Sequence, residues 1–126
     1  MAYTAEIDLW RDFIYRTFRD KATPLFFFDE QILPAASVWT GLRGWVHTLR
    51  ELSWGVGHKL LLALPPSPGF LYVLFAALWQ NIPLAVLPVV DRQKQNSWAE
   101  LRRDLEESVA LLRPHGVVVP QALADM

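Results

Sequence analysis

Apolar residues recur every three or four positions in three segments of the chain, and this spacing is typical of amphipathic helices. The segments cover residues 5–19, 38–52 and 98–112. Polar and charged residues fill most of the remaining positions, so each helix is predicted to bury one face. The residues predicted to line the buried faces are Ile7, Trp10, Ile14 and Phe18; Val38, Leu42, Trp45, Val46, Leu49 and Leu52; and Trp98, Leu101, Leu105, Val109 and Leu112.

Residues with helix-capping side chains precede these three segments. Thr4, Ser37 and Ser97 can each accept a backbone N–H at a helix start, and Ser97 with Glu100 has the Ser-x-x-Glu spacing of a capping box. Gly55 follows the second segment, where a helix commonly ends in a left-handed residue. We therefore expect helices that begin after these caps and a left-handed Gly55.

Short apolar runs without helical spacing predict strands. The run 25–28 turns back towards Ile32 and Leu33 and predicts a hairpin. Three further runs, at 59–64, 84–89 and 117–119, are nearly unbroken, as expected of strands buried in a parallel sheet.

A fourth helix is predicted between the first two of these buried strands. Ser67 is a suitable N-cap and Pro68 fits the first helical position, so the helix should run from there to about Gln80. The segment 70–79 is apolar on all sides, and such a helix must be covered by the sheet and by neighbours or another chain.

The order of elements from residue 59 onwards is strand, helix, strand, helix, strand, which implies parallel strands with right-handed crossovers. The predicted fold class is α/β: a partial doubly wound unit of three short parallel strands with flanking helices, plus an N-terminal helix and a short hairpin. A chain of 126 residues is expected to form one domain. It divides into an N-terminal helix (1–22), a hairpin and helix (23–57) and a βαβαβ unit (58–120).

Composition and charge exclude several classes of function. The net charge is -1 and the chain has no Cys. A disulfide framework and thiolate metal sites are therefore excluded, and nucleic-acid binding is not expected. No secretory signal is recognisable, so the cytoplasm is the expected location. Residues 60–90 carry no charge, but five prolines interrupt them, which favours buried strands and helix over a membrane span.

The sequence offers no recognisable catalytic, cofactor-binding or metal-binding residues. The turn at 65–68 is proline-rich and lacks the free amides that hold a phosphate. Ser67 has no nucleophile motif around it. His47, His58 and His115 do not have the spacing of a metal pair.

The large apolar side chains suggest a protein interface instead. The chain is 52% hydrophobic and contains six Trp and seven Phe, more than a domain of this size readily buries. On the fourth helix, Phe70, Tyr72, Phe75 and Trp79 are expected in the core, and they are also the candidate interface residues.

Several passages resemble the N-terminal part of the adenylate-forming enzymes, which include acyl-CoA synthetases, fatty acyl-AMP ligases and amino-acid adenylation domains. The most specific passage is 60–70 (LLLALPPSPGF), similar to the family's "LLLP-x-SP-x-F". Residues 23–29, 39–55, 76–84 and 105–119 also resemble family phrases, with Asn81 in place of a usual Gly. The resemblance covers nearly the whole chain.

The resemblance implies the fold but assigns no functional residue. The family's phosphate loop, its ATP contacts and its C-terminal lysine lie beyond the matched residues. We therefore expect a non-catalytic, truncated module that acts by protein contact as a scaffold, dimerisation or regulatory subunit in acyl, polyketide or peptide metabolism. An apolar flank would be closed by a homodimer or a partner protein.

Two other hypotheses stay open. The chain could be the N-terminal piece of a split or excised acyl-activating ligase that is active only with its remaining domains. A peripheral membrane protein that inserts residues 70–79 is disfavoured, because no Lys/Arg-rich face accompanies that segment.

Overall fold

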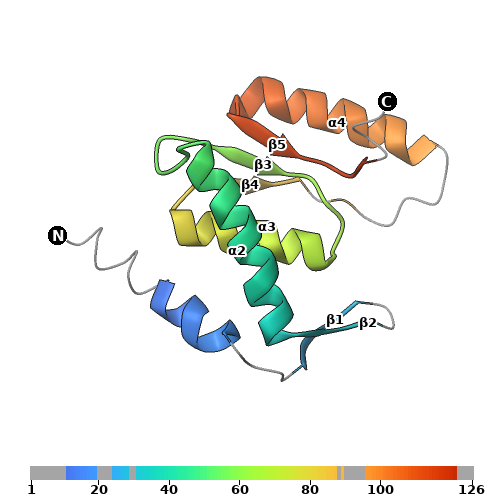
Figure 1. Ribbon diagram of the computed structural model, residues 1–126. Coiled ribbons are helices and arrows are strands. Elements are labelled where there is room, and N and C mark those ends of the chain that lie inside the picture. The colour runs from blue at the N-terminus through green and yellow to red at the C-terminus, as the bar shows by residue number, and fades with distance from the viewer. Residues whose placement is uncertain (1–10, 20–23, 29–30, 88, 90–95, 122–126) are drawn as a thin grey trace.

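A three-stranded parallel sheet lies at the centre of the molecule (Figure 1). The computed structural model describes residues 11–19, 24–28, 31–87, 89 and 96–121. The strands are β3 (Leu60–Leu62), β4 (Leu84–Val86) and β5 (Gly116–Val118), in the order β4-β3-β5. Both outer strands run parallel to β3, as the sequence predicted.

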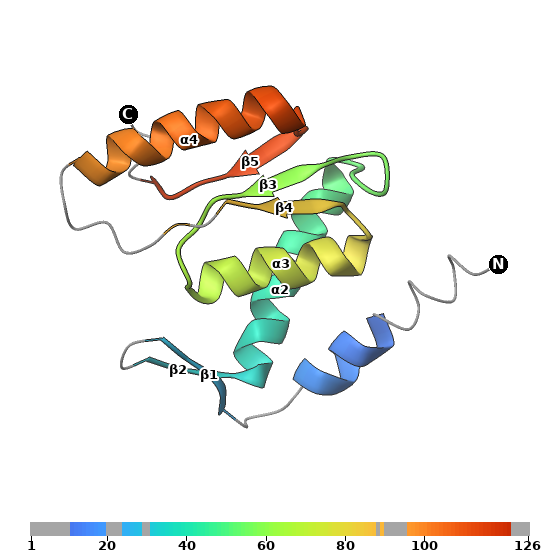
Figure 2. The same ribbon diagram turned by 180° about the vertical axis from the view of Figure 1, so that it is seen from behind.

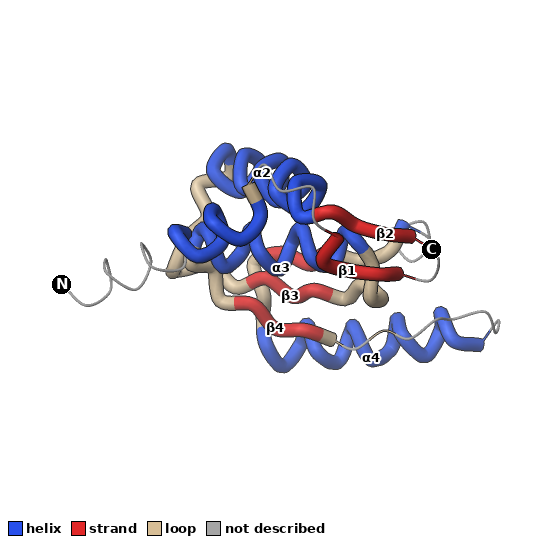
Figure 3. Tube along the Cα trace, turned by 90° about the horizontal axis from the view of Figure 1, so that it is seen from below, coloured by secondary structure: helices blue, strands red, loops and turns tan. Residues whose placement is uncertain are grey.

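Two crossover helices connect the strands on opposite faces of the sheet. Helix α3 (Pro68–Gln80) joins β3 to β4, and α4 (Asn96–Leu112) joins β4 to β5. Figure 3 shows α2 (Ala35–Glu51) and α3 on one side of the strands and α4 on the other. The predicted α/β class and its three parallel strands with flanking helices are confirmed.

The two faces of the sheet carry cores of different size. Alternate residues of a strand point to opposite faces. Leu60 and Leu62 of β3 therefore join a large cluster with α2 and α3. Ala63, on the opposite side, joins a small cluster with Val89 and Leu101 of α4. The side chains that α2 and α3 bury are Ala35, Val38, Leu42, Val46 and Leu49, and Val73, Ala76 and Ala77.

Both predicted ends of α2 are wrong by a few residues. The helix begins directly after Pro34, not after Ser37, because extended Pro34 (ψ 155°) ends β2 and two alanines suit the first turn. At the other end Ser53, with φ 59°, has the left-handed conformation predicted for Gly55. Leu52 follows the helix and is 55% exposed, so it does not extend the buried face.

The N-terminal part of the chain packs beside α2 and α3 (Figure 2). Strands β1 (Pro24–Phe28) and β2 (Gln31–Pro34) form the predicted antiparallel hairpin. The first helix is described over residues 11–18 and buries Ile14 and Phe18, as predicted. The predictions for Thr4, Ile7 and Trp10 fall outside the described residues.

Local capping signals set both ends of α3. The Ser67 Oγ accepts the Phe70 N–H at 3.2 Å, and Pro68 occupies the first helical position, as predicted. Asn81 ends the helix in the left-handed conformation (φ 56°). It therefore fills the left-handed position after a helix that glycine most often occupies.

Helix α4 begins at Asn96, one residue before the predicted cap. The side chains of Ser97 and Trp98 fall outside the described residues, so the capping box is untested. Over the described residues, the helices are too short or too polar to cross a membrane.

Candidate functional site

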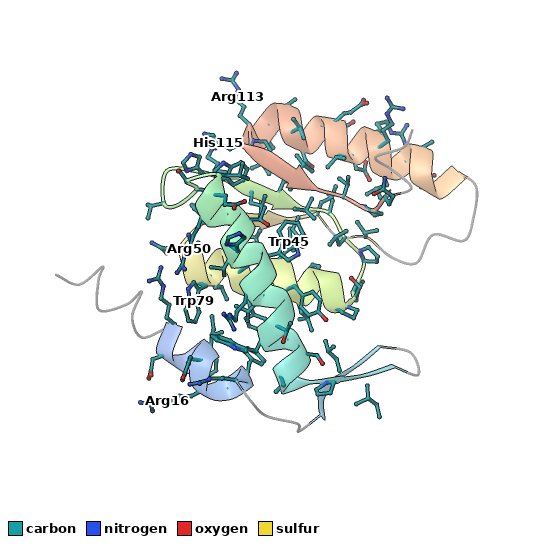
Figure 4. The ribbon with its side chains drawn as sticks, in the orientation of Figure 1. Arg16, Trp45, Arg50, Trp79, Arg113 and His115 are labelled. Carbon is teal, nitrogen blue, oxygen red and sulfur yellow. The ribbon has the colours of Figure 1, made fainter. Side chains whose placement is uncertain are left out.

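The four candidate interface residues all lie on α3 and are partly buried against the large core. They are Phe70, Tyr72, Phe75 and Trp79. The Phe75 ring contacts the ring of Phe18, with centroids 4.8 Å apart. Trp79 lies between α3 and the first helix, as Figure 4 shows, and its carbonyl accepts a hydrogen bond from Arg11 Nε at 2.9 Å. The first helix of this chain therefore covers part of the surface at Phe75 and Trp79.

The Tyr72 ring of α3 packs tightly against Gly41 of α2. A Cβ added to Gly41 would come within 2.5 Å of the Tyr72 ring, so the helix crossing requires glycine there. Beside this contact is an open groove of about 340 Å³, lined by Thr40, Gly41, Gly44, Trp45, Thr48 and Tyr72. Both threonine hydroxyls donate to carbonyls of their own helix, so the groove mainly offers aromatic and apolar surface.

Exposed apolar side chains gather at the end of α4 and in β5. Leu111 is 83% exposed, and Val109, Leu112 and Val117 are each more than a third exposed. We call these four residues the α4–β5 patch. Val109 and Leu112 belong to the stripe predicted to be buried, so that prediction is wrong for the last turns of α4. Leu111 was not part of the predicted stripe. Its position among the charged residues of α4 was the sequence signal that could have predicted its exposure.

Val109 and Leu112 are exposed because only the earlier residues of the α4 stripe pack in the small cluster. Leu101 and Leu105 pack where the strands end, against Ala63, Leu87, Val89 and Val119. Where the strands begin, a groove of about 130 Å³ remains between the sheet and the end of α4. Leu112 lines this groove as well as the patch. The other lining residues are Lys59, Leu60, Leu61, Pro83, Leu84, Ala85 and Pro114.

The titratable side chains of the described residues do not form a metal site. No three His, Cys, Asp or Glu side chains converge among them. His47 Nε2 lies 3.0 Å from Glu51 Oε1, and both side chains are on the exposed face of α2. His58 and His115, which the sequence separates widely, are in ring contact with each other. Sequence spacing alone could not have revealed this pair.

Ser67 has a structural role in the described geometry. Its hydroxyl oxygen caps α3, and Pro66 and Pro68 on either side have no N–H to offer an anion. These two positions of the turn therefore offer no N–H donor to a phosphate.

No protein-family model matches the chain, and no curated protein is significantly similar to it.

Comparison by structure finds adenylate-forming ligases. A benzoate CoA ligase from Burkholderia xenovorans LB400 superposes with TM-score 0.64 at 16% identity, over 92% of this chain and 22% of that one. The fatty acid AMP ligase from Legionella pneumophila gives 0.62 at 14% identity, over 92% and 19%. The Klebsiella oxytoca NpsA N-terminal subdomain gives 0.61 at 15% identity, over 91% and 27%.

These matches agree with the passages that the sequence shares with the family. The chain spans between 19% and 27% of the length of these solved structures. At such low identity the likeness concerns the fold, and the substrates of those ligases are not transferred to this chain. The chain has the fold of the N-terminal part of the adenylate-forming ligases.

Proposed function

We propose that this chain acts in the cytoplasm as a non-catalytic module of acyl, polyketide or peptide metabolism, and that it works by contact with other proteins. In this proposal two copies of the chain associate through the α4–β5 patch. The observation that carries it is the exposed apolar surface of the patch, which continues through Leu112 into the groove beside β4. Single exposed apolar residues are ordinary, whereas several on neighbouring elements that adjoin an apolar groove favour an interaction site.

Charges beside the patch favour a second copy as the occupant. Glu107 lies one turn before Leu111 on α4, and Arg113 directly follows the helix; both are exposed. Neither side chain forms an ion pair within the described part of the chain. A two-fold axis through the patch sets two α4 helices antiparallel, so that Arg113 of each copy approaches Glu107 of the other. The surface is therefore complementary to itself in charge as well as in apolar character.

The mass of the purified chain tests the proposal. Light scattering over a concentration series should give a dimer. Leu111→Glu should raise the dimer Kd at least about tenfold, because burying a leucine is worth about 1.5–3 kcal/mol. Ile32→Glu, at an exposed residue of the hairpin, is the matched control and should leave the Kd unchanged. A monomer at every concentration would contradict the proposal.

A charge exchange tests the orientation of the two copies. Glu107→Arg places like charges opposite each other and should weaken the dimer about two- to tenfold, as expected for two exposed pairs. Adding Arg113→Glu restores the opposite charges and should recover the original Kd. A double variant as weak as the single one would contradict the antiparallel arrangement.

The candidate interface residues Phe70, Tyr72, Phe75 and Trp79 stay in the proposal as a second contact surface. Of these, Tyr72 lines the open groove on α2. A dimer that persists in Leu111→Glu but is lost in Tyr72→Ala would move the contact to that groove.

The alternative function is that of an acyl-activating ligase fragment that works only with the remaining domains. The likeness to part of several ligases favours it. Isothermal titration with Mg-ATP tests whether this chain alone holds a nucleotide site. The chain should give no heat, since the proline-rich turn before α3 offers no phosphate cradle. Micromolar binding would show a nucleotide site and would favour the ligase fragment.

A further inference from the structure

The loop after α2 and the turn before β5 meet in an aromatic cluster. Trp54 stacks on His58, with ring centroids 5.5 Å apart and planes within 4°. His58 in turn meets His115 edge to face at 5.0 Å. Trp54 also covers Gly116, because a Cβ added there would collide with the indole ring. The cluster therefore joins the end of α2 to the start of β5.

Each of the two imidazoles accepts a backbone hydrogen bond. The Gly55 N–H donates to His58 Nδ1 at 3.2 Å, and the Lys59 N–H donates to His115 Nδ1 at 3.0 Å. A neutral imidazole has one acceptor nitrogen, so both rings carry their proton on Nε2. This tautomer removes the Nε2 lone pair that a metal ion would need.

The charged groups around the pair are mainly cations. Lys59 directly precedes β3, and its Nζ donates to the Leu112 carbonyl at 3.2 Å. Arg113 lies two residues before His115 in the same corner of the molecule (Figure 4). At the end of α2, Arg50 donates to Gln80 and Glu51 pairs with His47. Within the described residues, no carboxylate forms an ion pair with either ring of the cluster.

We propose that His58 and His115 form a proton-sensitive fastener, which holds the start of β5 against β3 near neutral pH and loosens on acidification. A proton added to Nδ1 turns the acceptor into a donor that faces another N–H, so the hydrogen bond is lost. Two imidazolium rings at this separation also repel each other. The inference does not depend on the proposed dimer.

Amide hydrogen exchange measured by NMR tests the fastener. Protection factors, referred to an unstructured chain at the same pH, are compared at neutral and mildly acidic pH. Those of the Gly55 and Lys59 amides should fall about tenfold in acid, the equivalent of one lost hydrogen bond each. The Leu71 amide, which donates to the Ser67 carbonyl, is the internal reference and should keep its protection. Unchanged protection at Gly55 and Lys59 would overturn the proposal.

Asparagine variants separate titration from packing. Asn offers Oδ1 near the position of Nδ1 and does not titrate, so His58→Asn with His115→Asn should abolish the pH dependence of both amides. His47→Asn, at an exposed histidine on α2, is the matched control and should retain it. If the double variant does not fold, each single variant should lose the effect at its own amide only. A pH dependence that survives both single substitutions would contradict the role of the pair.

Discussion

Two glycines one turn apart on α2 have opposite environments. A Cβ at Gly41 would meet the Tyr72 ring at 2.5 Å, whereas a Cβ at Gly44 has no neighbour within 4 Å. Both lie inside the helix, where glycine is intrinsically unfavourable. Only the first is therefore required by packing.

We predict that Gly41→Ala and Gly44→Ala change stability in opposite directions. Gly41→Ala should lower the free energy of unfolding by about 1–3 kcal/mol, because the two helices must move apart. Gly44→Ala should raise it by roughly 0.5–1 kcal/mol through helix propensity alone. Urea denaturation measures both values. Equal effects of the two substitutions would show that the crossing is not tight at Gly41.

At the level of single residues, the sequence predicted some caps and missed others. Ser67 followed by Pro68 is a strong local signal, and its outcome is as predicted. Ser37 was misassigned because the preceding proline and two alanines start the helix earlier. The left-handed residue after α2 is Ser53 and not Gly55. Residue preferences favour glycine over serine in this conformation, so they could not have predicted Ser53.

At the level of elements, α3 is the helix whose ends depend most clearly on side chains. We predict that Ser67→Ala lowers the free energy of unfolding by about 1 kcal/mol, because the Phe70 N–H loses its partner. Ser67→Asp keeps an acceptor at the cap and should cost much less. Thermal or urea unfolding compares the two. A loss as large for Asp as for Ala would mean that the cap contributes little.

Apolar spacing predicted which helices and strands form better than it predicted which of their side chains other elements cover. The stripe of α4 correctly contains buried Leu101, but it could not show that Val109 and Leu112 stay outside the small cluster. The α4–β5 patch depends on that long-range geometry. So does the contact between His58 and His115, which come from separate loops.

At the level of the whole molecule, the proposed dimer should make stability depend on concentration. The Tm of the unchanged chain should rise with protein concentration, because association stabilises the folded state by mass action. In Leu111→Glu the Tm should become nearly independent of concentration. Calorimetry at several concentrations measures this, and Ile32→Glu should behave like the unchanged chain.

The central position of β3 imposes an order of assembly during folding. The hydrogen bond that leads into its pairing with β5 joins Lys59 to His115 across 56 residues, whereas its pairing with β4 spans less than half that separation. Each doubling of a closed loop adds about 0.6 kcal/mol of entropy cost. The unit β3-α3-β4 can therefore assemble first on an emerging chain, and one edge of β3 stays unpaired until β5 has been synthesised.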